Sequence, residues 1–235
     1  MTSSQMIART IEAIPENKLI FASRLYEDEL REQVTESAYY KTLERFCKAG
    51  ELCKAAKGTY YRPRKSKYGI VPISEAEIIR AFTEEESGTV VGYSLYNRLK
   101  LTTQVGKTVE VYSSQLEQQT KKINNIFLNY CNLVFTPATE EVVHMMEVLQ
   151  NFGEIQELNY ASFLNYCKEF AAKFDNEVFD YVSKQLRYQK RTISFLYTIL
   201  NHFGVKNTLG KYLSSLSEYK HPSMEELYEA AYVSG

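Results

Sequence analysis

The sequence of 235 residues contains no tryptophan, five prolines and four cysteines. The cysteines form no C-x-x-C pair, and the three histidines lie far from them along the chain. Structural zinc sites usually show closely spaced cysteine and histidine pairs, so this spacing argues against bound zinc. We expect no metal site and no cofactor. The residues concerned are Cys47, Cys53, Cys131, Cys167, His144, His202 and His221.

Long apolar runs are also missing. No segment approaches the roughly 20 apolar residues that a membrane-spanning helix needs. The first residues, MTSSQMIART, lack the apolar stretch of a secretory signal. These absences predict a cytoplasmic protein that does not bind membranes and whose thiols stay reduced.

Common catalytic motifs are absent too. The sequence has no P-loop, no G-x-G-x-x-G, no H-E-x-x-H and no G-x-S-x-G. Glu140 and Glu141 lie four and three residues before His144, which places an acid and an imidazole on one helical face. A surface ion pair or a histidine at the edge of the core explains that pattern without catalysis. We therefore expect that the protein is not an enzyme.

Positive charge, by contrast, is concentrated in one stretch. Residues 38–67 carry nine basic residues against two acids, although the whole chain has a formal net charge of -1. Such a local positive field favours a polyphosphate partner. The basic residues are Lys41, Arg45, Lys48, Lys54, Lys57, Arg62, Arg64, Lys65 and Lys67.

The basic stretch falls on a recognisable series of elements. Two short helices are expected before residue 31, and a third over about Glu36–Ala49 has one apolar face and one mostly basic face. Glu51–Ala56 and Thr59–Arg62 then read as a β-hairpin around Gly58, which tolerates a positive φ. A charged stripe alone is often only a solvated helix surface. Helices followed by a basic helix and a basic hairpin are typical of a winged helix-turn-helix.

The predicted secondary structure changes twice along the rest of the chain. Pro63–Pro72 reads as a linker, and it is followed by a helix over Ser74–Phe82 and another over Val90–Leu99. Strands are expected over Thr108–Tyr112, Asn125–Leu128 and Asn132–Thr136, and helices dominate after Pro137. The prediction is an α+β protein in three regions. These are a winged helix over residues 1–67, a small α+β domain over 68–136 and a helical region over 137–235.

Three segments resemble the AbiEi-type antitoxin family of bacterial abortive-infection systems. They are IPENKLIFASRLYE with YYKTLERFCKAGELCKAAKGTYYRPRKSKYG, then PISEAEIIRAF, then VVGYSLYNRLKLTTQV, and they fall within residues 5–136. The resemblance implies a winged helix that binds its own promoter and regulates a type IV toxin–antitoxin operon. It also implies a nucleotidyltransferase-like toxin, which the antitoxin opposes without a stable complex.

Duplex DNA is thus the expected partner, with the third helix in the major groove and the hairpin along the backbone. Lys41 or Arg45 would reach guanine edges, and Ser37 and Tyr40 would contact phosphates or bases. A stand-alone regulator without antitoxin activity, or a protein-interaction module built on the aromatic C-terminal helices, are the alternatives. A homodimer would suit a repeated operator. The predicted DNA-binding residues are Ser37, Tyr40, Lys41, Arg45, Lys48, Lys54, Lys57, Arg62, Arg64 and Lys65.

Overall fold

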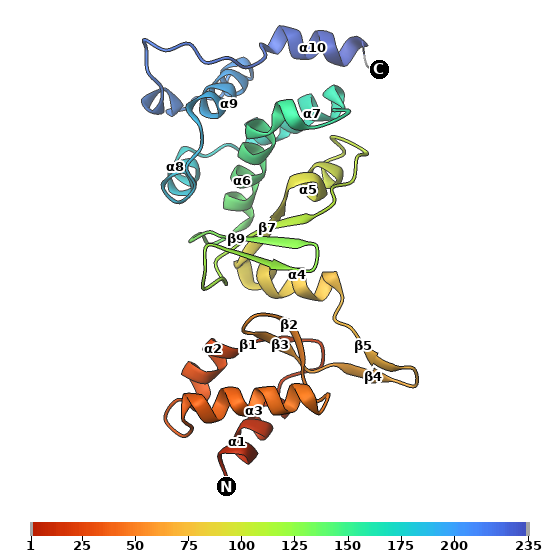
Figure 1. The fold of residues 1–235 in the computed structure, drawn as a ribbon. Coiled ribbons are helices and arrows are strands. Elements are labelled where there is room, and N and C mark those ends of the chain that lie inside the picture. The colour runs from red at the N-terminus through yellow and green to blue at the C-terminus, as the bar shows by residue number, and fades with distance from the viewer. Residues whose placement is uncertain (1, 234–235) are drawn as a thin grey trace. The chain divides into compact units, whose positions relative to one another are not determined.

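The structure, a computed structural model, describes residues 2–233 and divides into two compact units (Figure 1). The N-terminal unit comprises the residues up to Ala81 together with Lys122–Asn124. The C-terminal unit comprises Phe82–Lys121 and the residues from Asn125 onward. This division differs from the three predicted regions, because residues of 68–136 and of 137–235 share one hydrophobic core.

The N-terminal unit combines short helices with two small sheets. Strands β1, β3 and β2 form an antiparallel sheet in that order, and β4 pairs with β5 in a separate hairpin. The elements are α1 (Ser3–Glu12), β1 (Leu19–Phe21), α2 (Ala22–Leu25) continuing into a π-helical turn (Tyr26–Leu30), α3 (Glu36–Lys48), β2 (Cys53–Ala56), β3 (Thr59–Tyr61), β4 (Arg64–Ser66) and β5 (Gly69–Val71).

Capping and amphipathic spacing account for the helices of this unit. Thr2 caps α1 and forms a capping box with Gln5, while the Thr35 side chain accepts a hydrogen bond from the Ala38 amide at the start of α3. Apolar side chains three and four residues apart then face inward and form one core. That core includes Ile7, Ile11, Ala22, Leu30, Tyr39, Leu43, Phe46 and Leu52.

The predicted linker over Pro63–Pro72 is wrong, because most of it forms the β4–β5 hairpin. Arg64 pairs with Val71, and Ser66 pairs with Gly69 across the turn. Both prolines flank the paired strands, where no ladder hydrogen bond needs their missing amide. Both strands are largely exposed. Their sequences therefore lack the alternation of apolar and polar residues by which a half-buried strand is recognised.

The C-terminal unit is an α+β assembly that continues into helices. Its sheet has the order β6-β7-β9-β8, with β6 antiparallel and β9 parallel to β7. The unit boundary falls within α4 (Glu75–Thr83). The elements that follow are β6 (Gly88–Val91), α5 (Gly92–Arg98), β7 (Val109–Ser113), β8 (Thr120–Ile123), β9 (Ile126–Tyr130), α6 (Pro137–Gln150), α7 (Tyr160–Lys173), α8 (Asn176–Gln185), α9 (Lys190–His202) and α10 (Met224–Val233).

Two local predictions in this unit are corrected. The expected helix over Val90–Leu99 begins only at Gly92, since Gly88–Val91 is strand β6. The expected strand over Asn132–Thr136 pairs with no other strand in the described part of the chain. Leu133 and Phe135 are buried and alternate with exposed neighbours, so the segment has a strand-like pattern without a ladder.

The mixed helix and strand content confirms the α+β class, and the segment after Pro137 is helical as predicted. Between residues 2 and 233, no helix combines the length and the apolar character that crossing a membrane requires.

Candidate nucleic-acid interface

Helix α3 presents a polar stripe opposite its buried face. Tyr39, Thr42, Leu43 and Phe46 are buried against the N-terminal core. Ser37, Lys41 and Lys48 are exposed and lie on one stripe, since they are spaced by four and seven residues. The helix therefore has the exposed cationic face that the sequence predicted.

Tyr40 occupies a different position from the one expected. Its side chain is half-buried, packs against the N-terminal core and meets the Tyr39 ring edge-on at a centroid distance of 5.1 Å. This packing fixes the ring at the edge of the polar stripe. A contact to DNA from Tyr40 would come from its hydroxyl end.

Arg45 leans toward α1. Its Nη2 atom donates a hydrogen bond to the Ser4 hydroxyl, and its guanidinium lies 5.8 Å from the centroid of the Phe46 ring. The side chain remains exposed. Arg45 therefore lies on the side of α3 that borders α1. A contact to a DNA base would require it to break its hydrogen bond to Ser4.

The β2–β3 hairpin adds two exposed lysines. Lys54 lies on β2 opposite Tyr60, and Lys57 lies in the turn before Gly58. Gly58 has a φ of +69°, a conformation that costs glycine little, and its carbonyl accepts a hydrogen bond from the Ala22 amide at 2.9 Å. The tip of the hairpin is therefore fixed to the start of α2, and both lysines stay in solvent.

The hairpin lysines and those of α3 are exposed to solvent. Across the residues that the structure describes, Lys41, Lys48, Lys54 and Lys57 make no ion pair. Their charge is therefore available to a partner. Glu44, also exposed on α3, is the acid nearest in sequence to Lys41 and weakens the field there.

Arg62 is turned away from this surface. Its Nη1 atom donates to the carbonyl oxygens of Glu12 at 2.9 Å and Ile14 at 2.5 Å, just after α1 ends. A guanidinium at a helix C-terminus satisfies carbonyls that lack intrahelical partners. Its predicted role as a phosphate contact is not supported by this position.

Arg64 and Lys65 lie on the second hairpin. Both are exposed, but they are adjacent on β4, so their side chains leave opposite faces of the strand. Lys67 continues the basic run into the turn, with its ammonium 4.9 Å from the Tyr68 ring centroid. Arg64 and Lys65 therefore cannot both extend the same basic surface.

Asn17 is a residue that the sequence reasoning missed. It is buried and has a φ of +58°. Its backbone N–H donates a hydrogen bond to the Arg62 carbonyl oxygen at 2.8 Å, and its side-chain Oδ1 accepts one from the Arg64 backbone N–H at 3.3 Å. It thereby fixes the path from β3 into β4. The sequence does contain a hint of this role, because Asn17 follows Pro15-Glu16 in a turn. Asparagine is one of the residue types that tolerate the left-handed region of backbone conformation.

The acid and imidazole near residue 140 form a separate cluster in the C-terminal unit. The Thr89 hydroxyl lies 2.5 Å from Glu140 Oε1 and 2.7 Å from His144 Nε2, and Arg98 Nη2 is 3.3 Å from the same nitrogen. Burial, together with a smaller effect of the Arg98 guanidinium, lowers the pKa of His144 to about 3. The imidazole is neutral at physiological pH and ties α6 to β6 and α5.

A search for metal sites and two comparisons with known proteins gave no match that would identify a function. Among residues 2–233, no group of three or more His, Cys, Asp or Glu side chains is placed to hold a metal ion. No protein-family model matches the sequence, and no curated protein shows significant similarity to it.

Proposed function

We propose that the N-terminal unit is a winged helix-turn-helix domain that binds duplex DNA, with α3 as the recognition helix and the β2–β3 hairpin as the wing. The supporting observation is the order of elements, α1-β1-α2-α3-β2-β3, with β1 completing the sheet beside β3. Exposed lysines that make no ion pair within residues 2–233 occupy the helix and the hairpin that would face DNA.

In this proposal α3 enters the major groove, which admits an α-helix. Lys41 reaches the O6 and N7 atoms of a guanine. Arg45 does the same after its hydrogen bond to Ser4 is replaced by one to the base edge. Ser37 contacts a phosphate near the start of the helix. Lys48, Lys54 and Lys57 hold phosphates, while Arg62 is left out because its guanidinium already binds Glu12 and Ile14.

We further propose that the protein is a cytoplasmic autoregulator and antitoxin of an abortive-infection operon. The support for this step is the resemblance of residues 5–136 to AbiEi-type antitoxins. In that role it represses its own promoter and counters a nucleotidyltransferase-like toxin, and a dimer would suit a repeated operator.

The DNA-binding step is tested by fluorescence anisotropy with a labelled duplex of the protein's own promoter. The full chain should bind it, and the double variant Lys41→Ala, Arg45→Ala should lose at least about tenfold in affinity, as expected for two base-contacting cations. A charge-matched control, Lys168→Ala with Lys190→Ala, removes two exposed lysines of the C-terminal unit. Equal affinity of the two double variants would refute the assignment of α3.

The antitoxin step needs a separate test. The genes beside this one are searched for one that encodes a nucleotidyltransferase-like protein, which is expressed alone and together with the full chain while colony formation is counted. Restored growth supports the antitoxin role. Growth arrest that persists despite promoter binding leaves a regulator without antitoxin activity.

A further inference from the structure

The β4–β5 hairpin is a basic element that α3 and the β2–β3 hairpin leave without a role. Figure 1 shows it standing out from the rest of the N-terminal unit, and both of its strands are largely exposed. Lys65 and Lys67 are exposed, and neither makes an ion pair in the part of the chain from residue 2 to residue 233. A protruding hairpin whose cations are not neutralised suits the phosphates of a nucleic acid.

The register of the hairpin separates the two cations of β4. Residues directly opposite each other in an antiparallel pair share a face, so Lys65 shares one face with Ile70. Arg64 shares the other face with Val71. The Ile70 Cδ1 atom lies 3.9 Å from the position that a Cβ on Gly50 would occupy, and Gly50 comes just after the end of α3. The face that carries Lys65 is therefore the one beside the C-terminal end of α3.

Arg64 lies near the start of α4 instead. A hydrogen bond from the Ser74 backbone N–H, with smaller contributions that include the Arg64 guanidinium, lowers the pKa of the Glu77 carboxyl in the first turn of that helix. This influence requires the Arg64 charge to lie close to Glu77. Arg64 therefore faces an acid of its own unit, whereas Lys65 belongs to the face beside α3. Of these two residues, only Lys65 can extend the surface of the proposed recognition helix.

The turn of the hairpin is held in one conformation by Ser66. Its hydroxyl accepts a hydrogen bond from the Tyr68 backbone N–H at 3.1 Å and donates one to the Gly69 carbonyl oxygen at 3.2 Å. These bonds order the tip, where the Tyr68 ring is 88% exposed and its centroid lies 4.9 Å from the Lys67 ammonium. A ring this exposed adds almost nothing to the core. A turn that is ordered in advance loses less conformational entropy when it binds.

We propose that the β4–β5 hairpin is a second wing, which binds the DNA backbone beyond the C-terminal end of α3. Lys65 and Lys67 each hold a phosphate, and the Tyr68 ring packs against a sugar of the same backbone segment. Arg64 makes no contact with the DNA. These contacts position the protein without reading the base sequence. The inference rests on the proposed DNA binding by α3 and the β2–β3 hairpin, and it lengthens the bound site on one side.

Fluorescence anisotropy with a labelled duplex of the protein's own promoter measures what the second wing contributes. The double variant Lys65→Ala, Lys67→Ala should lose about tenfold in affinity at roughly 0.1 M salt, and the slope of its log K against log salt should be shallower by about 1.8. Tyr68→Ala should lose severalfold in affinity without a change in slope, because it removes no charge. Arg64→Ala is the matched control on the opposite face and should change affinity by less than about twofold.

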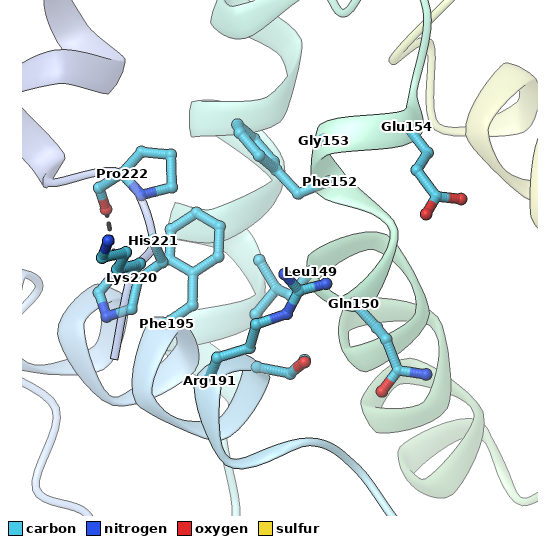
Figure 2. Close-up of a pocket in the computed structure, with 11 residues that line it drawn as sticks. Leu149, Gln150, Phe152, Gly153, Glu154, Arg191, Phe195, Lys220, His221 and Pro222 are labelled. Atoms are coloured by element: carbon cyan, nitrogen blue, oxygen red, sulfur yellow. Dashed lines mark hydrogen bonds between the residues drawn. The ribbon is translucent and has the colours of Figure 1, made fainter. Parts of the chain in front are cut away.

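A second control removes two cations from the C-terminal unit. Figure 2 shows Arg191 and Lys220 among the residues that line a pocket of about 450 Å³. Both are exposed, so Arg191→Ala with Lys220→Ala lowers the net charge by as much as the hairpin double variant does. This control should bind the promoter duplex as the parent protein does. An equal loss of affinity in the two double variants would show that only net charge matters and would overturn the second wing.

Hydroxyl-radical footprinting at saturating protein then locates the contact on the DNA. The variant Lys65→Ala, Lys67→Ala should lose backbone protection at one edge of the region protected by each bound copy, while the centre stays protected. Protection that is unchanged, or that is lost evenly across the site, would refute the second wing and leave DNA binding by α3 intact. A parent protein that does not bind the promoter duplex at all would refute the proposed DNA binding, and the second wing with it.

Discussion

The Arg62 guanidinium donates a hydrogen bond to the Glu12 carbonyl oxygen at 2.9 Å, which joins the end of β3 to the end of α1. The same nitrogen also reaches the Ile14 carbonyl. The basic run from Arg62 to Lys67 therefore contains one residue that holds the fold and others that face solvent. Charge in the sequence does not distinguish these two roles.

Arg62→Ala should lower the free energy of unfolding by about 2 kcal/mol, because two carbonyl oxygens lose a charged donor. Lys65→Ala is the control, since Lys65 is exposed on β4 and should change stability by less than about 0.5 kcal/mol. Urea unfolding followed by circular dichroism measures both. Equal midpoints for the two variants would show that the Arg62 contacts contribute nothing to the fold.

Sequence periodicity predicted the helices well because burial and helical spacing coincide in them. In α3, Tyr39, Leu43 and Phe46 are both apolar and buried, so the pattern identified the helix and its exposed face. Ser74 and Glu77 also form a capping box at the start of α4, with hydrogen bonds between each side chain and the backbone of the other residue. These features depend on residues close in sequence.

The failures occurred where distant residues decide the outcome. Strand β6 runs directly into α5 at Gly92, whose φ is +63° and whose missing Cβ would lie 3.3 Å from the Glu110 carboxylate. The sequence did not reveal the boundary between β6 and α5, because the apolar residues Val90 and Val91 are compatible with either a strand or a helix. Arg62 and Asn17 are similar cases, since their partners lie tens of residues away in sequence.

Salt dependence should separate the phosphate-binding lysines from Arg62. If Lys48, Lys54 and Lys57 each neutralise one phosphate, these three lysines should contribute roughly -3 to the slope with which log K for promoter DNA falls with log salt. Lys57→Ala should reduce the magnitude of that slope by about 0.9 and weaken all sequences alike. Arg62→Ala, measured where it is folded, should leave the slope unchanged. Anisotropy titrations at several salt concentrations give the slopes, and a changed sequence preference in Lys57→Ala would contradict a phosphate role.

Glu147 should make the stability fall with rising pH. Burial, together with a smaller effect of the nearby Glu110 carboxylate, raises its pKa to about 7, although the Asn151 side chain donates to its Oε1 atom at 2.8 Å. In the unfolded chain this pKa is about 4.3. Between these values the folded protein holds a proton that the unfolded chain has released. This contribution is complete below about pH 4.3 and declines as pH rises through 7, by on the order of 2 kcal/mol.

Glu147→Gln should remove that decline, so the variant should be more stable than the parent at pH 8 and similar to it at pH 4. His144 acts in the opposite direction, because its pKa is lowered to about 3 and its contribution is lost as pH falls. Thermal melts of both proteins from pH 4 to pH 8 isolate the Glu147 effect. A constant difference in Tm across that range would contradict the raised pKa.

Two buried threonines near helix starts in the C-terminal unit differ in whether their hydroxyls have a hydrogen-bond partner. The Thr139 hydroxyl donates to the Val134 carbonyl at 2.7 Å, whereas the Thr192 hydroxyl has no partner among residues 2–233. Thr139→Val should therefore cost about 1–2 kcal/mol, while Thr192→Val should leave stability unchanged or raise it by about 1 kcal/mol. Urea unfolding of the two variants measures the contrast. If Thr192→Val is destabilised as much as Thr139→Val, the Thr192 hydroxyl contributes to the stability of the fold although it has no hydrogen-bond partner within residues 2–233.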